Sequence, residues 1–274
     1  MNRPSRLVLL GHPVSHSFSP GMQTAALSAA NIPLTYSTKD VSSEELRATL
    51  ESLAKEGAAG NITIPHKEAA CILMTRVSPL AARIGAVNTF HTEADGTLLG
   101  DNTDVAGFSD LVATVLGASP CGAHFAVLGA GGAAAAVLAA VESWKGCTAT
   151  VYARNESRAA KLAKRFSDVA SSKSMTLAMP LAGDIVVNAT PVGLNDDELP
   201  IPLVAIPPRA TVLDLVCKAG GTAWVRTARA NGRIAGDGFP MLVGQGAAAF
   251  EIWFGVQPDR EAMWRGLRLQ MQSA

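Results

Sequence analysis

Short apolar runs alternate along the chain with stretches rich in alanine and leucine. In the first part of the chain, the runs predict strands and the stretches between them predict helices. We expect strands near residues 6–10, 34–40, 60–64 and 86–92, and helices near 20–30, 43–55 and 78–84. Alternation of this kind is typical of βαβ units, in which helices cover a parallel sheet.

The same alternation resumes after Asp104 and predicts a second α/β unit. There we expect helices near 104–117, 132–144 and 156–166, and strands near 124–129, 148–153, 184–188 and 211–215. From Gly236 onward, small and apolar residues predict a long helix, and a last helix follows Pro258. The proline-rich segment 199–209 is expected to be a surface loop.

The length and the composition indicate a globular protein with two domains. A chain of 274 residues exceeds what one compact core usually holds. The 23 basic and 23 acidic side chains balance, which argues against nucleic acid or an anionic membrane as the main partner. Residues 125–141 are uncharged, but alanines and three glycines fill much of that run, so a strand, a turn and a helix fit better than a membrane span.

The cysteines and the N-terminal segment bear on the cellular compartment. Cys71, Cys121, Cys147 and Cys217 form no CxxC pair and lie near no histidine at metal-ligand spacing. The apolar run after Met1 is too short for a signal peptide. We therefore expect reduced structural thiols, a cytoplasmic protein and no metal site.

A glycine-rich turn gives the clearest chemical signal. In VLGAGGAAAAV, Gly129, Gly131 and Ala134 fit the pattern GxGxxG/A between an apolar strand and an alanine-rich helix. Side chains at the first two positions would block the tight turn and keep a pyrophosphate away from the N–H groups at the helix start. The turn therefore predicts dinucleotide binding, with an ordinary tight turn as the alternative.

Two arginines after the next strand bear on the choice of dinucleotide. Arg154 follows that strand and Arg158 lies one turn further on. Guanidinium groups match phosphate geometry, so the pair favours NADP over NAD. Glu156 lies between them and keeps NAD open, because an acidic residue here would bind a ribose hydroxyl. Solvation of a helix start is the structural alternative for both arginines.

Two polar segments in the first part of the chain each have a structural and a functional explanation. GHPVSHSFSPGMQ places Ser17 and Ser19 just before a helix, and Ser19 followed by Pro20 suffices as an N-cap. Hydroxyls and free N–H groups at a helix start also suit a carboxylate ligand. In LLGDNTDVAGF, Asp104 could simply cap the following helix.

Other polar residues stand at or inside apolar segments. Asn88 in GAVNTF and Gln245 in MLVGQGAAAF each need a partner, which is either the protein or a ligand. Lys67 and His66 follow the strand of GNITIPHK, where a solvated lysine and a capping imidazole are the plain interpretation. Taken one at a time, none of these residues decides a function.

The segments together resemble a known family. HSFSP, NITIPHK, IGAVNTF, GDNTDVAGF, GAGGAA, NATPVG and GDGFPMLVGQ occur in the order and approximate spacing of the shikimate dehydrogenase family, over essentially the whole chain. The resemblance implies an α/β fold with two α/β domains and an active-site cleft between them. These are a substrate-binding domain, 1–104 plus 238–274, and a Rossmann-type NADP-binding domain, 105–237.

The resemblance also implies an activity and a catalytic pair. The activity is reversible NADPH-dependent reduction of 3-dehydroshikimate to shikimate, in the pathway of aromatic amino acid biosynthesis. By motif, Lys67 and Asp104 correspond to the catalytic residues. Negative charge builds on the carbonyl oxygen as the hydride arrives, and a lysine paired with an aspartate offers both a cation and a proton.

The remaining site residues are also carried over by motif. Ser17 and Ser19 correspond to a carboxylate clamp. Ring contacts are implied for Thr63, Asn88, Gln245 and the position of Cys217. Cofactor contacts are implied for Gly129, Ala130, Gly131, Gly132, Ala133, Arg154, Arg158, Thr190, Leu215, Gly238 and Met241.

Several positions depart from the family pattern. Gln23-Thr24 replaces a usual His-Asn pair, Val105 a glycine and Ala153 an asparagine. Cys217 stands where a tyrosine is expected, which removes a phenol from the substrate pocket. Quinate or an amino-substituted relative of shikimate is therefore an alternative substrate.

Three hypotheses follow from the sequence. The first is an NADP-dependent shikimate dehydrogenase, acting as a monomer or homodimer on a small-molecule substrate. The second is a quinate/shikimate or amino-shikimate dehydrogenase-like paralogue that uses NAD or NADP. The third is a nicotinamide-binding sensor on the same scaffold, against which Lys67 and Asp104 argue.

Overall fold

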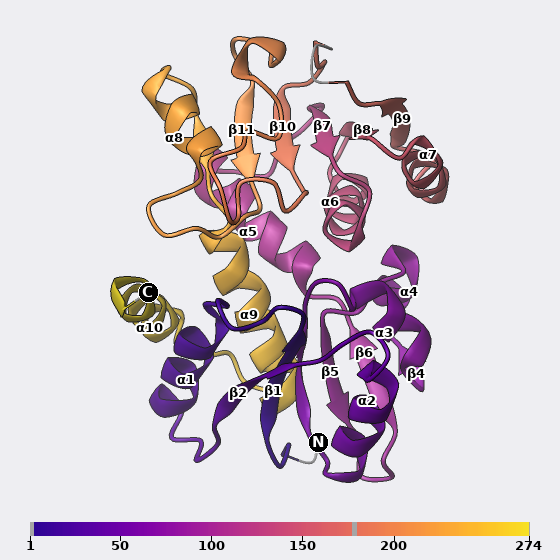
Figure 1. Ribbon diagram of the computed structural model, residues 1–274, viewed down its shortest axis with the longest axis vertical. Helices are drawn as coiled ribbons and strands as arrows, with labels where there is room; N and C mark the ends of the chain where they lie inside the picture. The colour runs from indigo at the N-terminus through magenta and orange to yellow at the C-terminus, as the bar shows by residue number, and fades with distance from the viewer. Residues whose placement is uncertain (1–2, 177–179, 274) are drawn as a thin grey trace. The chain divides into compact units, whose positions relative to one another are not determined.

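The chain folds into two compact α/β units (Figure 1). The computed structural model describes residues 3–176 and 180–273. Unit 1 comprises Met1–Thr103 and Val243–Ala274, and unit 2 comprises Asp104–Leu242. The second boundary therefore falls inside a helix, whereas the sequence placed it at residue 238, before that helix.

Unit 1 is built on a mixed sheet with the strand order β2-β1-β3-β5-β6-β4. Its strands are β1 (Leu7–Gly11), β2 (Tyr36–Asp40), β3 (Ala59–Ile62), β4 (Arg76–Val77), β5 (Thr89–Thr92) and β6 (Leu98–Asp101). β1 is parallel to β2 and β3, whereas β5 runs antiparallel to both of its neighbours. The helices are α1 (Ser19–Ala29), α2 (Leu46–Lys55), α3 (Lys67–Leu73), α4 (Pro79–Ile84), most of α9 (Phe239–Phe254) and α10 (Arg260–Ser273).

Unit 2 is built on a parallel sheet with the strand order β12-β11-β10-β7-β8-β9. Its strands are β7 (His124–Leu128), β8 (Thr148–Ala153), β9 (Ala170–Ser174), β10 (Ile185–Asn188), β11 (Thr211–Asp214) and β12 (Ala235–Gly236). Its helices are α5 (Asp104–Leu116), α6 (Gly132–Ser143), α7 (Glu156–Arg165) and α8 (Ala223–Ala230), with a 3₁₀ turn at Leu203–Ala205. This is the Rossmann strand order, which reverses between β7 and β10.

The predicted strands and helices are confirmed to within a few residues at their ends. The sequence missed α3, α8 and the strands β4, β6, β9 and β12. Most of these elements are short, and the two-residue strands β4 and β12 are strands only because they pair with β6 and β11. Within the described residues, no helix is both long and apolar enough to cross a membrane.

The proline-rich segment 199–209 is not simply the surface loop that its composition predicts. Ile201 and Ile206 are fully or almost fully buried and belong to the same apolar cluster as Trp224 of α8. The indole Nε1 of Trp224 donates a hydrogen bond of 3.1 Å to the carbonyl of Ile201. Prolines remove backbone donors without removing apolar side chains, so such a segment can still cover a core.

The core of unit 1 requires a very close approach of β1 and β3. Gly60 lies opposite Val8 in the parallel pair. A Cβ atom on Gly60 would lie 1.9 Å from the carbonyl oxygen of Val8, which is backbone and cannot turn aside. Leu10 of β1 belongs to one buried apolar cluster with Leu50 and Phe90.

We therefore expect Gly60→Ala to destabilise the protein by about 2 kcal/mol or more, because the β1–β3 pair must separate. Relief of unfolded-chain entropy favours alanine by only about 0.4–1 kcal/mol and acts in the opposite direction. Denaturant titration measures the change. Thr38→Ala, on the exposed part of β2, is the control and should stay within about 0.5 kcal/mol. A Gly60→Ala protein as stable as the wild type would contradict the prediction.

Candidate functional site

The glycine-rich turn joins β7 to α6 at the point where the strand order of unit 2 reverses. Gly129 has φ +112°, and a Cβ atom there would lie 2.9 Å from the carbonyl oxygen of Ala189. Gly131 is the N-cap of α6, and a Cβ atom on it would meet nothing within 4 Å. The first glycine is therefore required by the fold, while the second leaves space before a helix N-terminus, as a pyrophosphate needs.

The two arginines lie beyond the carboxyl end of β8, the strand beside β7. Asn155 caps α7, and its Oδ1 accepts a hydrogen bond of 3.0 Å from the backbone N–H of Arg158. The side chains of Arg154, Glu156 and Arg158 are exposed. Because β7 and β8 are parallel, the arginines and the glycine turn lie at the same edge of the sheet.

A buried polar network holds the loops after β10 and β11. Asn188 donates through Nδ2 to Asp214 Oδ1 at 2.8 Å, and its Oδ1 accepts from the backbone N–H and the hydroxyl of Thr190 at 3.0 and 2.6 Å. Asp214 also accepts from the Thr222 hydroxyl at 2.7 Å and from the Val216 N–H at 3.1 Å. The network fixes Thr190 relative to the end of β11.

Further members of the predicted cofactor set lie beside this network. The Leu215 N–H donates to the carbonyl of Asn188 at 3.0 Å. A Cβ atom on Gly238 would lie 2.4 Å from the carbonyl oxygen of Leu215 and 3.0 Å from Cys217 Sγ. The fold thus brings Leu215, Cys217 and Gly238 together, and Met241 is buried in the first turns of α9.

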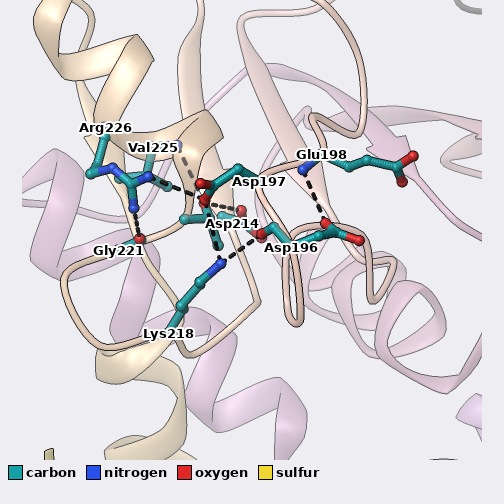
Figure 2. A network of polar contacts seen from close by, with 9 residues as sticks. Asp196, Asp197, Glu198, Asp214, Lys218, Gly221, Val225 and Arg226 are labelled. Atoms are coloured by element: carbon teal, nitrogen blue, oxygen red, sulfur yellow. Dashed lines mark hydrogen bonds and ion pairs between the residues drawn. The ribbon is translucent and has the colours of Figure 1, made fainter.

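Charged residues join the loop before Pro200 to the loop after β11 and to α8 (Figure 2). Lys218 Nζ donates to the carbonyl of Asp196 at 2.6 Å and lies 3.5 Å from the Asp197 carboxylate. Arg226 pairs with the same carboxylate at 3.2 Å and also donates to the carbonyl of Gly221 at 2.6 Å. The hydrogen bond from Arg226 lowers the pKa of Asp197, but the pair is exposed and contributes little stability.

Burial sets the protonation of two groups in this region. It raises the pKa of Asp214 to about 6, although three hydrogen-bond donors oppose that shift. Burial and the nearby carboxylates of Asp237 and Asp214 raise the pKa of the Cys217 thiol. Cys217 is therefore a protonated thiol and not a nucleophilic thiolate.

In unit 1, the serine segment forms a turn at the start of α1. The Ser19 N–H donates to Ser17 Oγ at 3.2 Å. The prediction of Ser19 as the N-cap is wrong: α1 begins at Ser19 itself, Phe18 is the N-cap, and no side chain at the cap accepts a hydrogen bond. Ser19 is buried beside the Tyr36 hydroxyl.

A chain of buried hydrogen bonds extends from that hydroxyl across the sheet. Tyr36 donates to Asn61 Oδ1 at 2.8 Å, and Asn61 Nδ2 donates to the carbonyl of Asn88 at 3.2 Å. Asn88 Nδ2 then donates to Gln245 Oε1 at 3.3 Å. Burial raises the pKa of Tyr36, so it remains a phenol and a donor. Asn88 and Gln245, predicted separately, thus belong to one network, beside which Ser19 is buried.

Tyr36 and Asn61 were not predicted from the sequence as members of this network. Asn61 carries the same signal as Asn88, an amide inside an apolar strand, and could have been found by it. Tyr36 follows a proline-containing loop at the start of β2 and offers no comparable pattern. Its role depends on contacts with residues far away in the sequence.

The predicted catalytic residues each begin a helix. Lys67 is the half-buried first residue of α3, and its carbonyl accepts from the Val87 N–H at 2.9 Å. Thr63 directly follows β3 in the segment that leads to α3. Asp104 is buried and is the first residue of α5. The preceding Thr103 donates its N–H to Asn88 Oδ1 at 2.7 Å, which fixes the DNTD segment beside Asn88.

His66 differs from its neighbour Lys67. Its imidazole is buried, and Nε2 lies 2.6 Å from the carbonyl oxygen of Val41. A carbonyl only accepts hydrogen bonds, so Nε2 carries the proton and joins α3 to the end of β2. His66 thus has a structural partner. Among residues 3–176 and 180–273, no group of three or more histidine, cysteine, aspartate or glutamate side chains is arranged to hold a metal ion.

Comparison with known proteins gives close matches over most of the chain. The family model described as the shikimate dehydrogenase substrate binding domain matches residues 9–90, and the shikimate 5'-dehydrogenase C-terminal domain matches residues 238–268. The shikimate dehydrogenase (NADP(+)) of Rubrobacter xylanophilus is 41% identical over 94% of this chain and 94% of its own length.

Solved structures agree with the sequence matches. Shikimate 5-dehydrogenase from Thermus thermophilus, in complex with NADP(H) and shikimate, is 37% identical with a TM-score of 0.87, covering 97% of this chain and 99% of that one. The 5-ketofructose reductase of Gluconobacter sp. strain CHM43 is 27% identical with a TM-score of 0.84, covering 98% and 99%.

The raised pKa of Asp214 predicts a pH-dependent stability. The carboxyl titrates near 3.8 when unfolded and near 6 when folded, so between these values the folded protein holds more protons. The contribution of Asp214 to stability is therefore largest below about pH 4 and is lost as the pH rises to about 6. Asp214→Asn removes this dependence and retains an acceptor for Asn188.

We expect the free energy of unfolding of the wild type, relative to Asp214→Asn, to be up to about 3 kcal/mol larger at pH 4 than at pH 7, so that the wild type is the more stabilised at pH 4. Denaturant titrations of both proteins across this range measure the difference. Asp168→Asn, at an exposed position, controls for the change in net charge. A difference that does not vary with pH would show that Asp214 ionises as it does in the unfolded chain.

Proposed function

The chain belongs to the shikimate dehydrogenase family, and on that premise we propose that it reduces 3-dehydroshikimate reversibly to shikimate with NADPH. It is an NADP-dependent oxidoreductase of the shikimate pathway. The observation that carries the proposal is the hydrogen-bond network joining Asn88 and Gln245 in unit 1, beside the buried Ser19, because it gathers the polar residues that a hydroxylated ring acid requires.

Substrate binding is assigned to unit 1 residues. The hydroxyls of Ser17 and Ser19 bind the ring carboxylate at the start of α1, where the helix dipole also favours an anion. Thr63, Asn88 and Gln245 contact the ring hydroxyls. The Nδ2 atom of Asn88 lies 3.3 Å from the Oε1 atom of Gln245, so one ring can reach both side chains.

Lys67 and Asp104 are assigned to the chemistry. The bound cofactor supplies the hydride that adds to the carbonyl carbon. Lys67 stabilises the negative charge on the carbonyl oxygen and gives it a proton, which completes the hydroxyl. Asp104 orients the ammonium group. In the reverse direction, Lys67 accepts the proton as the alcohol is oxidised.

Cofactor binding is assigned to unit 2. Gly129, Gly131 and the residues between and after them, Ala130, Gly132 and Ala133, bind the pyrophosphate through backbone N–H groups. Arg154 and Arg158 bind the 2′-phosphate. Thr190, Leu215, Gly238 and Met241 contact the cofactor near the ends of β10 and β11.

Two observations favour a second candidate substrate. A related fold belongs to a protein named 5-ketofructose reductase, so the scaffold alone does not fix the ketone. Cys217 offers a weakly bonding protonated thiol where the family pattern has a phenol. Quinate or an amino-substituted shikimate is the second candidate substrate. A cytoplasmic location and a monomeric or homodimeric state are further proposals.

Purified protein should reduce NADP⁺ with shikimate, measured by nicotinamide absorbance, and do so faster than with quinate or with NAD⁺. Lys67→Ala should lower kcat/KM by about 10²–10⁴-fold, because it removes the proton donor. Lys55→Ala, at an exposed position in α2, is the control. A wild type that binds NADP⁺ but oxidises no substrate would favour the sensor hypothesis, and a preference for quinate would favour the second substrate.

Arg154→Ala and Arg158→Ala should each raise KM for NADP⁺ by about tenfold, while KM for NAD⁺ changes little, since each removes a charged hydrogen bond to the 2′-phosphate. The measurement is the ratio of kcat/KM values for the two cofactors. Lys161→Ala, on an exposed turn of the same helix, should leave that ratio unchanged. Equal losses with both cofactors would assign the arginines a structural role instead.

A further inference from the structure

Gln270, near the end of the last helix, holds the backbone of the serine turn, residues 17–21. Its Nε2 donates to the carbonyl of Ser17 at 2.7 Å, and its Oε1 accepts from the N–H of Gly21 at 2.8 Å. The side chain is half-buried, and both partners lie about 250 positions away in the sequence. One amide therefore bridges the two ends of the turn.

Two glycines allow α10 to come this close to α1, beside which it lies (Figure 1). A Cβ atom on Gly266 would lie 2.3 Å from the carbonyl oxygen of Gly21. A Cβ atom on Gly21 would lie 2.5 Å from Gln270 Oε1. Side chains at either position would push the helices apart and take Gln270 out of reach of the turn.

Gln270 also acts as part of a helix cap. The first N–H groups of a helix have no partner within the helix, and the N-cap Phe18 supplies none from its side chain. Ser17 Oγ accepts the N–H of Ser19, Pro20 has none, and Gln270 accepts the N–H of Gly21. The Ser17 hydroxyl accepts through a lone pair, so its hydrogen can point to an oxygen of a ligand.

We propose that Gln270 is a positioning residue for substrate binding, which fixes the serine turn so that the hydroxyls of Ser17 and Ser19 receive the ring carboxylate. This inference rests on the proposed function, in which those two serines bind that carboxylate. Gln270 is neutral and acts on the backbone, so its effect is on geometry and not on charge. It should change the affinity for the acid and leave hydride transfer nearly unaltered.

The test uses two variants, Gln270→Ala and Gln270→Met. The methionine keeps the length and the apolar contacts of the side chain, in case the alanine weakens the packing of α10. Steady-state kinetics are measured with shikimate and with its methyl ester, which lacks the negative charge, and shikimate binding is measured by calorimetry. Gln272→Ala, at an exposed position on the same helix, is the matched control.

We expect KM and Kd for shikimate to rise by about tenfold in both variants. A change of this size is about what the loss of one hydrogen bond causes. KM for NADP⁺ and kcat should stay within about twofold. The preference of the wild type for the acid over the ester should shrink by the same factor as the affinity. Gln272→Ala should match the wild type in every value.

The outcomes separate the two proposals. A wild type that neither binds nor oxidises shikimate overturns both of them. If the wild type is active and Gln270→Met has the same affinity for shikimate and the same preference for the acid, only the role of Gln270 is overturned. A rise in KM that is equal for the acid, the ester and NADP⁺ also overturns it, because it shows a general loss of structure.

Discussion

The arrangement of unit 1 depends on the hydrogen bonds of one buried amide, that of Asn88. Its Oδ1 accepts from the N–H of Thr103 at 2.7 Å, and its Nδ2 donates to Thr103 Oγ1 at 3.0 Å and to Gln245 at 3.3 Å. Its carbonyl accepts from Asn61 and from the N–H of Ile62. A buried amide without such partners costs about 1–3 kcal/mol for each unpaired group. Satisfying Asn88 therefore fixes the position of three segments at once.

Unit 2 uses the same device at the ends of its strands, but with a carboxylate. Asn188 is the last residue of β10 and Asp214 the last residue of β11. The hydrogen bonds of their side chains hold the loops that follow these strands. The carboxylate accepts more hydrogen bonds than an amide, which suits the crowded end of β11, but its burial raises its pKa. In both units, rigid strands provide the frame and buried polar side chains hold the loops that carry the proposed chemistry.

The sequence predicted well what depends on local pattern. Apolar periodicity found the long strands and helices, and glycine spacing found the turn at Gly129. It failed where a distant partner decides the structure. Ser19 looked like an N-cap because Pro20 follows it, but the N–H of Gly21 is satisfied by Gln270, a residue near the other end of the chain. Tyr36 acts through contacts with residues far away in the sequence, Asn61 and Trp253 among them, and no spacing within β2 reveals them.

The division of labour between the units bears on substrate choice. In the proposed function, the groups that bind the carboxylate and the ring hydroxyls come from unit 1, and Cys217 is the ring contact assigned from unit 2. A protonated thiol is a weak donor, so it contributes much less to orientation than a phenol does. Recognition of the ring then depends mainly on Ser17 and Ser19 and on the Tyr36–Asn61–Asn88–Gln245 network, whose members are linked by hydrogen bonds through side chains and the carbonyl of Asn88. A ring that lacks a hydroxyl makes fewer hydrogen bonds to these residues, so the site favours a ring acid that carries its hydroxyls at matching positions.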